Sequence, residues 1–400
     1  MKIPLRFCLF VIIPAAVTVY SFLALKPETE PSAAEKPGPE TAENTAPETQ
    51  TFRPLSSTLT FVAAGDNLFH QPMLRPPKAG ETYDFTPFYA GVKDLIESAD
   101  VAFVNQETLL AGKDFGFSSY PRFNTPQEAG DALIQTGFTV INHANNHIMD
   151  KGEAAVFATM DFWDSHPEAT YLGIRRSQEA RDTPTIIEKN SIRLGFLAYT
   201  YDTNGLGPPK DKPYLVSLID QEVMTKEIQR IRPRCDFLIV SMHWGNEYYH
   251  RPSEGQKKLA GFLAEQGVDL IIGHHPHVLQ PAASFPRKNG GPPALCFYSL
   301  GNFISAQDMN KTLLGGLLYL KLKKENSQVS VEETGVIPVV THYEGGFTNI
   351  QVFPLYAYPK ELAEKHRNAG KNNFSIENLR ALAGELLGPQ LMNYNPFVQP

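Results

Sequence analysis

The chain is 400 residues long, which is enough for one large domain or two smaller ones around a well-buried core. Its composition is that of an ordinary globular protein, with 42% hydrophobic and 20% charged residues. The formal charge of −7 gives no electrostatic reason to expect nucleic acid as a partner, so a surface that binds a polyanion is expected only as a local patch.

The N-terminus carries an apolar segment of membrane-spanning length. Residues 7–25 are uncharged and mostly apolar, and as a helix rising ~1.5 Å per residue they would span roughly 28 Å. Lys2 and Arg6 precede the segment and acidic residues follow it, so the basic flank should stay in the cytoplasm and the rest should be exported. Residues 1–25 are therefore predicted to be a single-pass anchor in the cell membrane, with the folded domain extracytoplasmic. A cleaved signal peptide is the alternative.

Residues 26–56 are predicted to be a disordered linker. They are rich in Pro, Glu, Thr and Ala and hold almost no large apolar side chain, so they cannot offset the entropy lost when a backbone is ordered. Prolines and mutually repelling glutamates should hold the folded part away from the membrane surface.

Five strand-like apolar runs each end in a short cluster of side chains that can bind metal. In chain order the clusters are Asp66 after residues 59–64, Asn105 and Glu107 after 101–104, Asn145, Asn146 and His147 after 139–141, His243 after 237–241, and His274, His275 and His277 after 270–272. In open α/β sheets ligands bind beyond the carboxyl ends of the strands, so these clusters are expected to converge although they lie far apart in sequence.

From residue 59 onward, apolar β-branched runs alternate with helical periodicity, which is the pattern of an α/β layered fold. Thr125, followed by Pro126 and Glu128, predicts a helix start. Ser253 and Gln256 predict a second one, as a capping box. Further strands are expected at 185–188, 192–198, 295–299, 317–322 and 329–336, and a helix at 221–231. Residues 307–400 hold few chemistry-bearing side chains and are predicted to be strands and a tail that complete the domain.

The clusters favour a transition-metal site. The hard oxygen ligands are Asp66 and Glu107, and the imidazoles are His147, His243, His275 and His277. Mn, Fe or Zn suit such a mixed set better than Ca or Mg do, and the number of ligands is enough for one or two divalent ions. Two ions ~3.5–4 Å apart activate water and stabilise a displacement at phosphorus or carbon, so hydrolysis is the reaction that the site favours.

The run from His274 to His277 is the strongest local signal. Alternate side chains of an extended segment point the same way, so His275 and His277 should face the ions while His274 points elsewhere. Gly65 should let the backbone turn sharply before Asp66. Three other histidines lack patterned neighbours and are expected to be surface or core polar residues: His70, His143 and His250.

Several side chains have two interpretations each. Asp150 would either orient the imidazole of His147 as a hydrogen-bond acceptor or cap the helix that begins near Gly152. Arg122 is a candidate for binding a carboxylate or phosphate through two hydrogen bonds, with a surface salt bridge as the alternative. Cys235 and Cys296, which lie beside core strands, are either buried thiols or a disulfide.

Six motifs together resemble the CapA family of poly-γ-glutamate capsule synthesis proteins. They are Gly65-Asp66, Val104-Asn105-Gln106-Glu107, Asn145-Asn146-His147 with Asp150, His243-Trp244-Gly245, Gly273-His274-His275-Pro276-His277-Val278 and Ser299-Leu300-Gly301-Asn302-Phe303. The resemblance covers about residues 58–304. It implies that residues 57–306 form a calcineurin-like metallophosphatase domain, a four-layer αββα sandwich of two sheets flanked by helices.

By that similarity seven residues fall on the family's metal-site positions: Asp66, Glu107, Asn146, His147, His243, His275 and His277. Metallophosphatases usually place a histidine two residues after the first aspartate, where this chain has Leu68. The second motif offers Asn105 and Glu107 where a bridging aspartate is expected.

The resemblance implies a role in the synthesis, export or trimming of an anionic cell-surface polymer such as poly-γ-glutamate, alongside membrane subunits of capsule synthesis. If the site is catalytic, His147 or Asp150 would assist a water nucleophile beside the ions. Two alternatives stay open: a general metal-dependent phosphoesterase, and a non-catalytic scaffold subunit that binds the polymer.

Overall fold

The computed structural model describes residues 56–75, 82–288, 290–371 and 373–392. The predicted membrane anchor at 1–25 and all but the last residue of the predicted linker lie outside these ranges. Within them, no helix combines the length and the apolar character needed to cross a bilayer.

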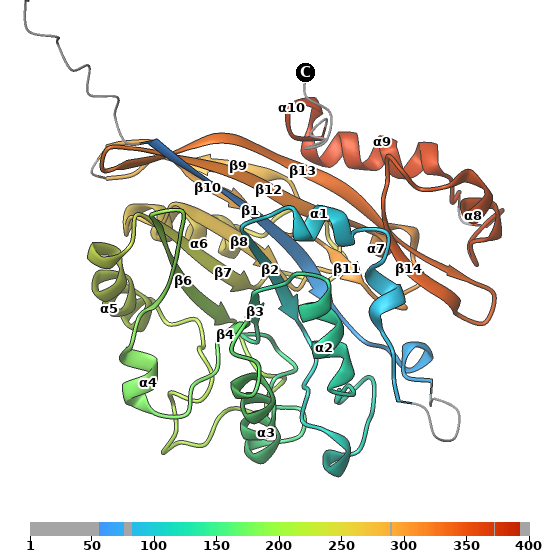
Figure 1. The fold of residues 1–400 in the computed structure, drawn as a ribbon, viewed down its shortest axis with the longest axis horizontal. Coiled ribbons are helices and arrows are strands. Elements are labelled where there is room, and N and C mark those ends of the chain that lie inside the picture. The colour runs from blue at the N-terminus through green and yellow to red at the C-terminus, as the bar shows by residue number, and fades with distance from the viewer. Residues whose placement is uncertain (1–55, 76–81, 289, 372, 393–400) are drawn as a thin grey trace, which may run out of the picture. The chain divides into compact units, whose positions relative to one another are not determined.

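Two sheets form the centre of the fold (Figure 1). The first has eight strands in the order β14-β13-β12-β1-β2-β3-β4, with β11 paired to the end of β1. Their bounds are β1 Ser56–Asn67, β2 Val101–Gln106, β3 Val140–Asn142, β4 Thr170–Leu172, β11 Asn302–Ile304, β12 Leu314–Glu325, β13 Gln328–Glu344 and β14 Thr348–Pro354. Strands β1 to β4 are parallel, whereas β12 to β14 join them through antiparallel pairs. The C-terminal strands are thus part of the sheet that carries Asp66 and Glu107.

The second sheet has six strands in the order β5-β6-β7-β8-β10-β9. Their bounds are β5 Thr185–Lys189, β6 Ile192–Thr200, β7 Phe237–His243, β8 Leu270–His274, β9 Ala282–Phe285 and β10 Ala294–Phe297. The inner strands are parallel, and the edge strands β5 and β9 are antiparallel to their neighbours. All five strands predicted to carry metal-type residues are present, three in the first sheet and two in the second.

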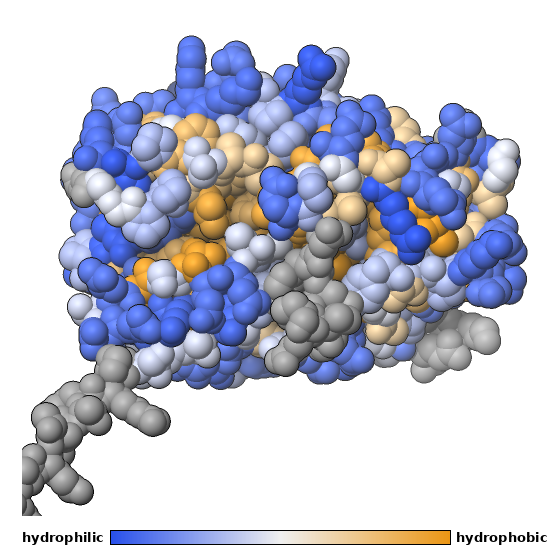
Figure 2. All heavy atoms as spheres, turned by 90° about the horizontal axis from the view of Figure 1, so that it is seen from above, coloured by the Kyte–Doolittle hydropathy of each residue, from blue (hydrophilic) through white to orange (hydrophobic). Residues whose placement is uncertain are grey.

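Helices cover the sheets and join their strands. The α-helices are α1 Lys93–Glu97, α2 Glu128–Gln135, α3 Glu153–Asp164, α4 Gln178–Asp182, α5 Gln221–Ile231, α6 Glu254–Glu265, α7 Asn310–Leu313, α8 Lys360–Lys365, α9 Ile376–Leu387 and α10 Pro389–Met392. Short 3₁₀ helices are η1 Gln71–Met73, η2 Thr86–Tyr89, η3 Lys113–Phe115 and η4 Arg232–Arg234. Helix α10 contacts both β13 and α9 (Figure 1). The face seen in Figure 2 has a band of hydrophobic residues between hydrophilic ones.

The main core lies between the two sheets. The rings of Phe61 in β1 and Phe196 in β6 lie 6.3 Å apart. Alternate residues of β7 face opposite sides: Phe237 belongs to this shared core, whereas Leu238 belongs to a second core with residues of α5 and α6. The second sheet is therefore buried on both faces, which explains its uninterrupted apolar strands.

One of the two predicted helix starts is confirmed. Ser253 Oγ accepts from the Gln256 backbone N–H at 3.2 Å, and Gln256 Oε1 accepts from the Ser253 N–H at 2.9 Å, so α6 begins with the predicted capping box. The prediction that Thr125 caps α2 is wrong, because α2 begins at Glu128. The buried Thr125 hydroxyl donates instead to Thr108 Oγ1 at 2.8 Å.

Cys235 and Cys296 are free and buried, so the alternative of a disulfide between them is wrong. Burial raises the pKa of Cys235 to about 11, which makes it an unreactive thiol at neutral pH.

Candidate metal centre

The ends of β1, β2 and β3 place three polar side chains side by side. Strand register pairs Asp66 with Asn105, and Asn105 with Asn142. Asn105 Nδ2 donates to Asp66 Oδ1 at 2.8 Å, and Asn142 Nδ2 donates to Asn105 Oδ1 at 2.8 Å. This relay of amides fixes the Asp66 carboxylate at the carboxyl end of the first sheet.

Gly65 allows the backbone of β1 to pack closely against the backbone at residue 301. A Cβ at residue 65 would lie 1.9 Å from the Gly301 carbonyl oxygen, which also accepts from the Asp66 N–H at 2.9 Å. Residue 65 continues β1 as a strand, so the predicted sharp turn is wrong. Glycine is required because the backbone of residue 301 approaches too closely for a side chain.

Glu107 follows β2 and is completely buried. Neither carboxylate oxygen accepts a hydrogen bond from a described residue. Glu107 Oε1 lies 3.5 Å from His243 Nε2 and 3.7 Å from His277 Nε2. Burial and the negative charge of Asp66 raise the pKa of Glu107 well above its usual value. A buried carboxylate without donors is costly unless a cation balances it, so this position fits a metal ligand.

The segment after β8 turns sharply. His275 has φ +95° and His277 has φ +58°, both in the left-handed region, so the predicted extended conformation is wrong. The turn nevertheless brings both side chains to Glu107. The expectation that His274 points elsewhere is also wrong, since its Nδ1 lies 3.4 Å from Asp66 Oδ1. The reason is that His274 is still the last residue of β8, where its ring stacks on that of Phe103 in β2 and so faces the first sheet.

His277 is held in one tautomer by two acceptors. Its Nδ1 lies 3.1 Å from Asp66 Oδ2 and 3.1 Å from Asn302 Oδ1, so Nδ1 carries the proton and donates. Nε2, the nitrogen nearer Glu107, keeps its lone pair for a metal, a common arrangement of metal-binding histidines. Burial alone would raise the pKa of Asp66, but the imidazoles of His274 and His277 outweigh it and hold that pKa well below its usual value.

His243 enters from the second sheet as the last residue of β7. Its Nε2 lies 2.9 Å from Asn146 Oδ1, and Asn146 Nδ2 donates to Asn204 Oδ1 at 3.3 Å. Burial lowers the pKa of His243 well below its usual value, and burial lowers the pKa of His275 to about 3. Both imidazoles are therefore neutral at pH 7, which is the form that binds metal.

His147 and Asp150 form a pair beside the centre. His147 Nδ1 lies 2.8 Å from Asp150 Oδ2, which also accepts from the Phe123 N–H at 2.7 Å. Asp150 thus orients the imidazole. The alternative that it caps a helix is wrong, because α3 begins at Glu153 with Gly152 at its N-cap.

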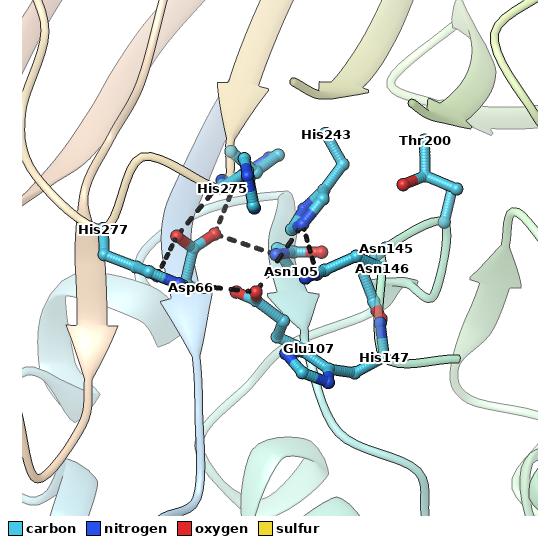
Figure 3. A network of polar contacts seen from close by, with 12 residues as sticks. Asp66, Asn105, Glu107, Asn145, Asn146, His147, Thr200, His243, His275 and His277 are labelled. Atoms are coloured by element: carbon cyan, nitrogen blue, oxygen red, sulfur yellow. Dashed lines mark hydrogen bonds and ion pairs between the residues drawn. The ribbon is translucent and has the colours of Figure 1, made fainter. Parts of the chain in front are cut away.

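Two overlapping groups of ligand atoms are close enough to hold ions. Within each group all atoms lie within 4.8 Å of one another: Glu107, His275 and His277 in the first, and Asp66, Glu107 and His243 in the second. Figure 3 shows these side chains pointing toward one another from β1, β2, β7 and β8. Glu107 belongs to both groups, so it is placed to bridge two ions. His147 is in neither group, and the buried Leu68 offers no ligand where a histidine is usual.

A cleft of about 700 Å³ opens onto the centre, and Asn146, His147 and His277 form part of its lining. Arg122 is exposed in the same lining and forms no ion pair with a described residue. His70 also lines this cleft, although the sequence marked it only as a polar residue.

Other residues at the site were not predicted from the sequence. Asn302 lies in the motif Ser299–Phe303, which was a usable signal. Asn204 and Glu247 had none, because no pattern links them to their distant neighbours. The remaining unpatterned histidines are polar residues as expected: His143 Nε2 accepts from Trp163 Nε1 at 2.7 Å, and His250 Nδ1 lies 2.8 Å from the Leu279 carbonyl oxygen.

Comparison with known families agrees with the motifs. The sequence profile described as "Bacterial capsule synthesis protein PGA_cap" matches residues 60–307, which is more than half of the chain. The chain therefore belongs to this family of capsule synthesis proteins. The matched region contains every predicted metal residue.

One relative is named for PGA biosynthesis and another for capsule biosynthesis. The chain is 32% identical over 224 residues to the "PGA biosynthesis protein CapA" of Bacillus subtilis, covering 54% of this chain and 57% of the relative. It is 32% identical over 210 residues to the "Capsule biosynthesis protein CapA" of Bacillus anthracis, covering 51% and 49%. The chain thus matches about half the length of these relatives.

The comparison with solved structures gives only distant matches. The calcineurin-like phosphoesterase YfkN from Bacillus subtilis has a TM-score of 0.42 and 14% identity, covering 71% of this chain and 91% of the other. A 5′-nucleotidase precursor from Thermus thermophilus has a TM-score of 0.42 and 14% identity, covering 82% and 58%. Similarity at this level says nothing about the reaction.

Proposed function

We propose that the chain is an extracytoplasmic metal-dependent hydrolase that trims an anionic cell-surface polymer of the poly-γ-glutamate kind. The observation that carries the proposal is Glu107, a buried carboxylate without hydrogen-bond donors that two groups of ligand atoms share. Membership of a capsule synthesis family, and relatives named for PGA and capsule biosynthesis, support the choice of polymer. We assign the two sheets and their helices to the four-layer αββα metallophosphatase type.

Asp66, Glu107, His243, His275 and His277 would hold one or two ions of Mn, Fe or Zn, with Asn146 as a further oxygen ligand. When bound, such an ion supplies Lewis acidity to a water nucleophile and to the bond under attack.

The chain's own residues would do the rest of the chemistry. Asp150 accepts the Nδ1 proton of His147, which leaves Nε2 of His147 free to take a proton from water or give one to the leaving group. Arg122 would bind a carboxylate of the polymer from the wall of the cleft.

The N-terminal sequence supports the proposed location. We propose that residues 1–25 tether the protein to the membrane and that the domain works outside the cytoplasm beside membrane subunits of capsule synthesis. Fractionation of cells that express the full chain tests this: the protein should sediment with membranes and be digested by protease added to spheroplasts. Protection from that protease would place the domain in the cytoplasm.

The reaction is tested with the purified full chain after incubation with Mn²⁺, Fe²⁺ or Zn²⁺. We expect bound metal by elemental analysis and cleavage of poly-γ-glutamate by mass spectrometry. His275→Ala and His277→Ala should lose both metal and cleavage, whereas His166→Ala, which removes a partly exposed imidazole paired with Asp131, should keep both.

Other outcomes would contradict trimming. Two bound ions with turnover of a phosphodiester, and none of the polymer, would identify a general phosphoesterase. Lack of metal, together with polymer binding that His275→Ala and His277→Ala leave unaltered, would identify a scaffold subunit.

A further inference from the structure

Among the described residues, the cleft over the candidate metal centre is lined by one carboxylate and one guanidinium that have no ion-pair partner. Among the described residues that line it, the acidic ones are Asp150 and Glu247, and Arg122 alone has a permanent positive charge. Asp150 is occupied by His147 and the Phe123 N–H. Glu247 and Arg122 are exposed and form no ion pair with each other or with another described residue.

Glu247 is placed on the His277 side of the cleft. The next residue, Tyr248, donates its backbone N–H to the Pro276 carbonyl oxygen at 2.8 Å, and its ring lies 6.0 Å from that of His277. Glu247 also acts on its surroundings through charge: burial raises the pKa of Tyr201 and of Tyr248 to about 12, and the carboxylate of Glu247 adds to the rise in both. This carboxylate therefore faces the mouth of the centre.

Arg122 is placed on the His147 side. The next residue, Phe123, donates its N–H to Asp150, and its ring lies 4.6 Å from that of His147. Asn124 anchors the loop that carries Arg122, since its Nδ2 donates to the Gly112 carbonyl oxygen at 2.9 Å. Glu247 and Arg122 thus come from separate loops, one on the His277 side of the cleft and one on the His147 side.

An unpaired carboxylate is unfavourable in a cleft that binds a polyanion, because like charges repel each other. Such a carboxylate becomes favourable where the ligand itself has a positively charged group. Every unit of a γ-glutamyl chain has an α-carboxylate, but the unit at the amino end also has an α-ammonium group, separated from its carboxylate by one carbon atom. An Arg and a Glu at one entrance match this zwitterionic end and mismatch the interior of the chain.

We propose that the cleft recognises the amino-terminal unit of a γ-glutamyl chain, with Glu247 binding its α-ammonium group and Arg122 binding an α-carboxylate. This inference rests on the proposed function and makes the protein an end-directed hydrolase. Hydrolysis breaks the C–N bond of the first γ-amide: water supplies a hydroxyl group to the γ-carbonyl carbon and a proton to the nitrogen. The products are free glutamate and a chain shortened by one unit, whose nitrogen is the new amino end.

The test uses the manganese-loaded full chain and two probes, tri-γ-glutamate and the same peptide N-acetylated at its amino end. Affinity is measured by calorimetry, and mass spectrometry of the same samples reports cleavage. The free peptide should bind about fivefold more tightly than the acetylated one, the upper range for a solvent-exposed ion pair. Glu247→Gln should reduce this ratio to about one.

Arg122→Gln should weaken both peptides and keep the ratio, because both retain their α-carboxylates. Glu168→Gln and Arg234→Gln serve as matched controls, since both residues are exposed, lie outside the cleft lining and form no ion pair with a described residue. They should behave like the wild type.

Three outcomes would overturn the inference. An equal affinity of the wild type for both peptides, or an unchanged ratio in Glu247→Gln, rules out recognition of the amino end; if the peptides are still cleaved, the proposed function stands. If neither peptide binds nor is cleaved, the proposed function fails with it.

Discussion

At the scale of single residues, Glu107 offers the most direct test of the metal hypothesis. In the metal-free protein, Glu107→Gln removes a buried carboxyl group whose oxygens accept no hydrogen bond from a described residue, so the free energy of unfolding should stay unchanged or rise by about 1–3 kcal/mol. With Mn²⁺ present, the variant lacks the ligand common to both groups and should lose the metal-induced rise in Tm. Calorimetry with and without Mn²⁺ measures both effects. An equal rise in Tm for wild type and variant would contradict the assignment.

Asp150 acts through His147, so its removal should affect the rate more than the fold. Asp150→Asn keeps an oxygen for the Phe123 N–H and for the His147 Nδ1 proton but removes the negative charge. Cleavage of poly-γ-glutamate should slow by about ten- to a hundredfold, as is typical when the partner of an imidazole at a metal site is changed. The Tm and the bound metal should remain close to the wild type. A loss of metal together with activity would instead make Asp150 part of the metal shell.

At the scale of elements, the turn after β8 combines backbone strain with metal-type side chains. His275 has φ +95°, a conformation that glycine adopts without penalty and alanine does not. Both His275→Ala and His275→Gly should lose metal, but in the metal-free state the glycine variant should be more stable by about 1 kcal/mol. Urea unfolding with a chelator present measures this difference. A more stable alanine variant would mean that residue 275 leaves the left-handed region when no ion is bound.

Elements were predictable from the sequence where local signals were strong. The strands that hold Asp66 and His243, and the strand just before Glu107, follow from apolar runs, and α6 follows from its capping box. Local sequence rules gave wrong predictions where tertiary contacts determine the backbone conformation. Thr125 looked like a helix cap, but its hydroxyl is taken by Thr108, which no pattern in the surrounding residues indicates. The turn at His275 was missed because nothing local marks a histidine for positive φ.

At the scale of the whole molecule, the site depends on two sheets whose strand ends meet. Convergence of the clusters was predictable, because chemistry-bearing residues follow the carboxyl ends of parallel strands. Which residues contact each other across the two sheets was not predictable. For example, Asn204 follows β6 but forms a hydrogen bond with Asn146, which follows β3. Such pairs depend on how the two sheets pack. That packing depends on how side chains fit together over the whole core, and no periodic pattern in the sequence indicates it.

The opposite ends of the same strands are tied together by Asp236, and this tie should make stability depend on pH. Asp236 precedes β7 and accepts from Arg193 Nη2 of the second sheet and from Lys324 Nζ of the first, both at 2.9 Å. Burial would raise the pKa of Asp236, but the hydrogen bonds of Arg193 and Lys324 hold it well below its usual value. A lowered carboxylate pKa adds stability above the unfolded value of about 3.9, and this stability is lost as the pH falls toward the lower folded value.

Asp236→Asn should therefore destabilise the protein by about 1 kcal/mol at pH 7, a modest effect because Arg193 is 43% exposed and solvent screens the pair. The difference from the wild type should shrink as the pH is lowered from about 4 toward 2, where the native carboxylate begins to take up a proton. Urea unfolding at several pH values measures this, with the exposed Asp114→Asn as the control. Because Asp236 lies at the start of β7 and the metal-type His243 at its end, bound Mn²⁺ should be the same in both variants. A destabilisation that does not change with pH would show that Asp236 acts through packing instead of charge.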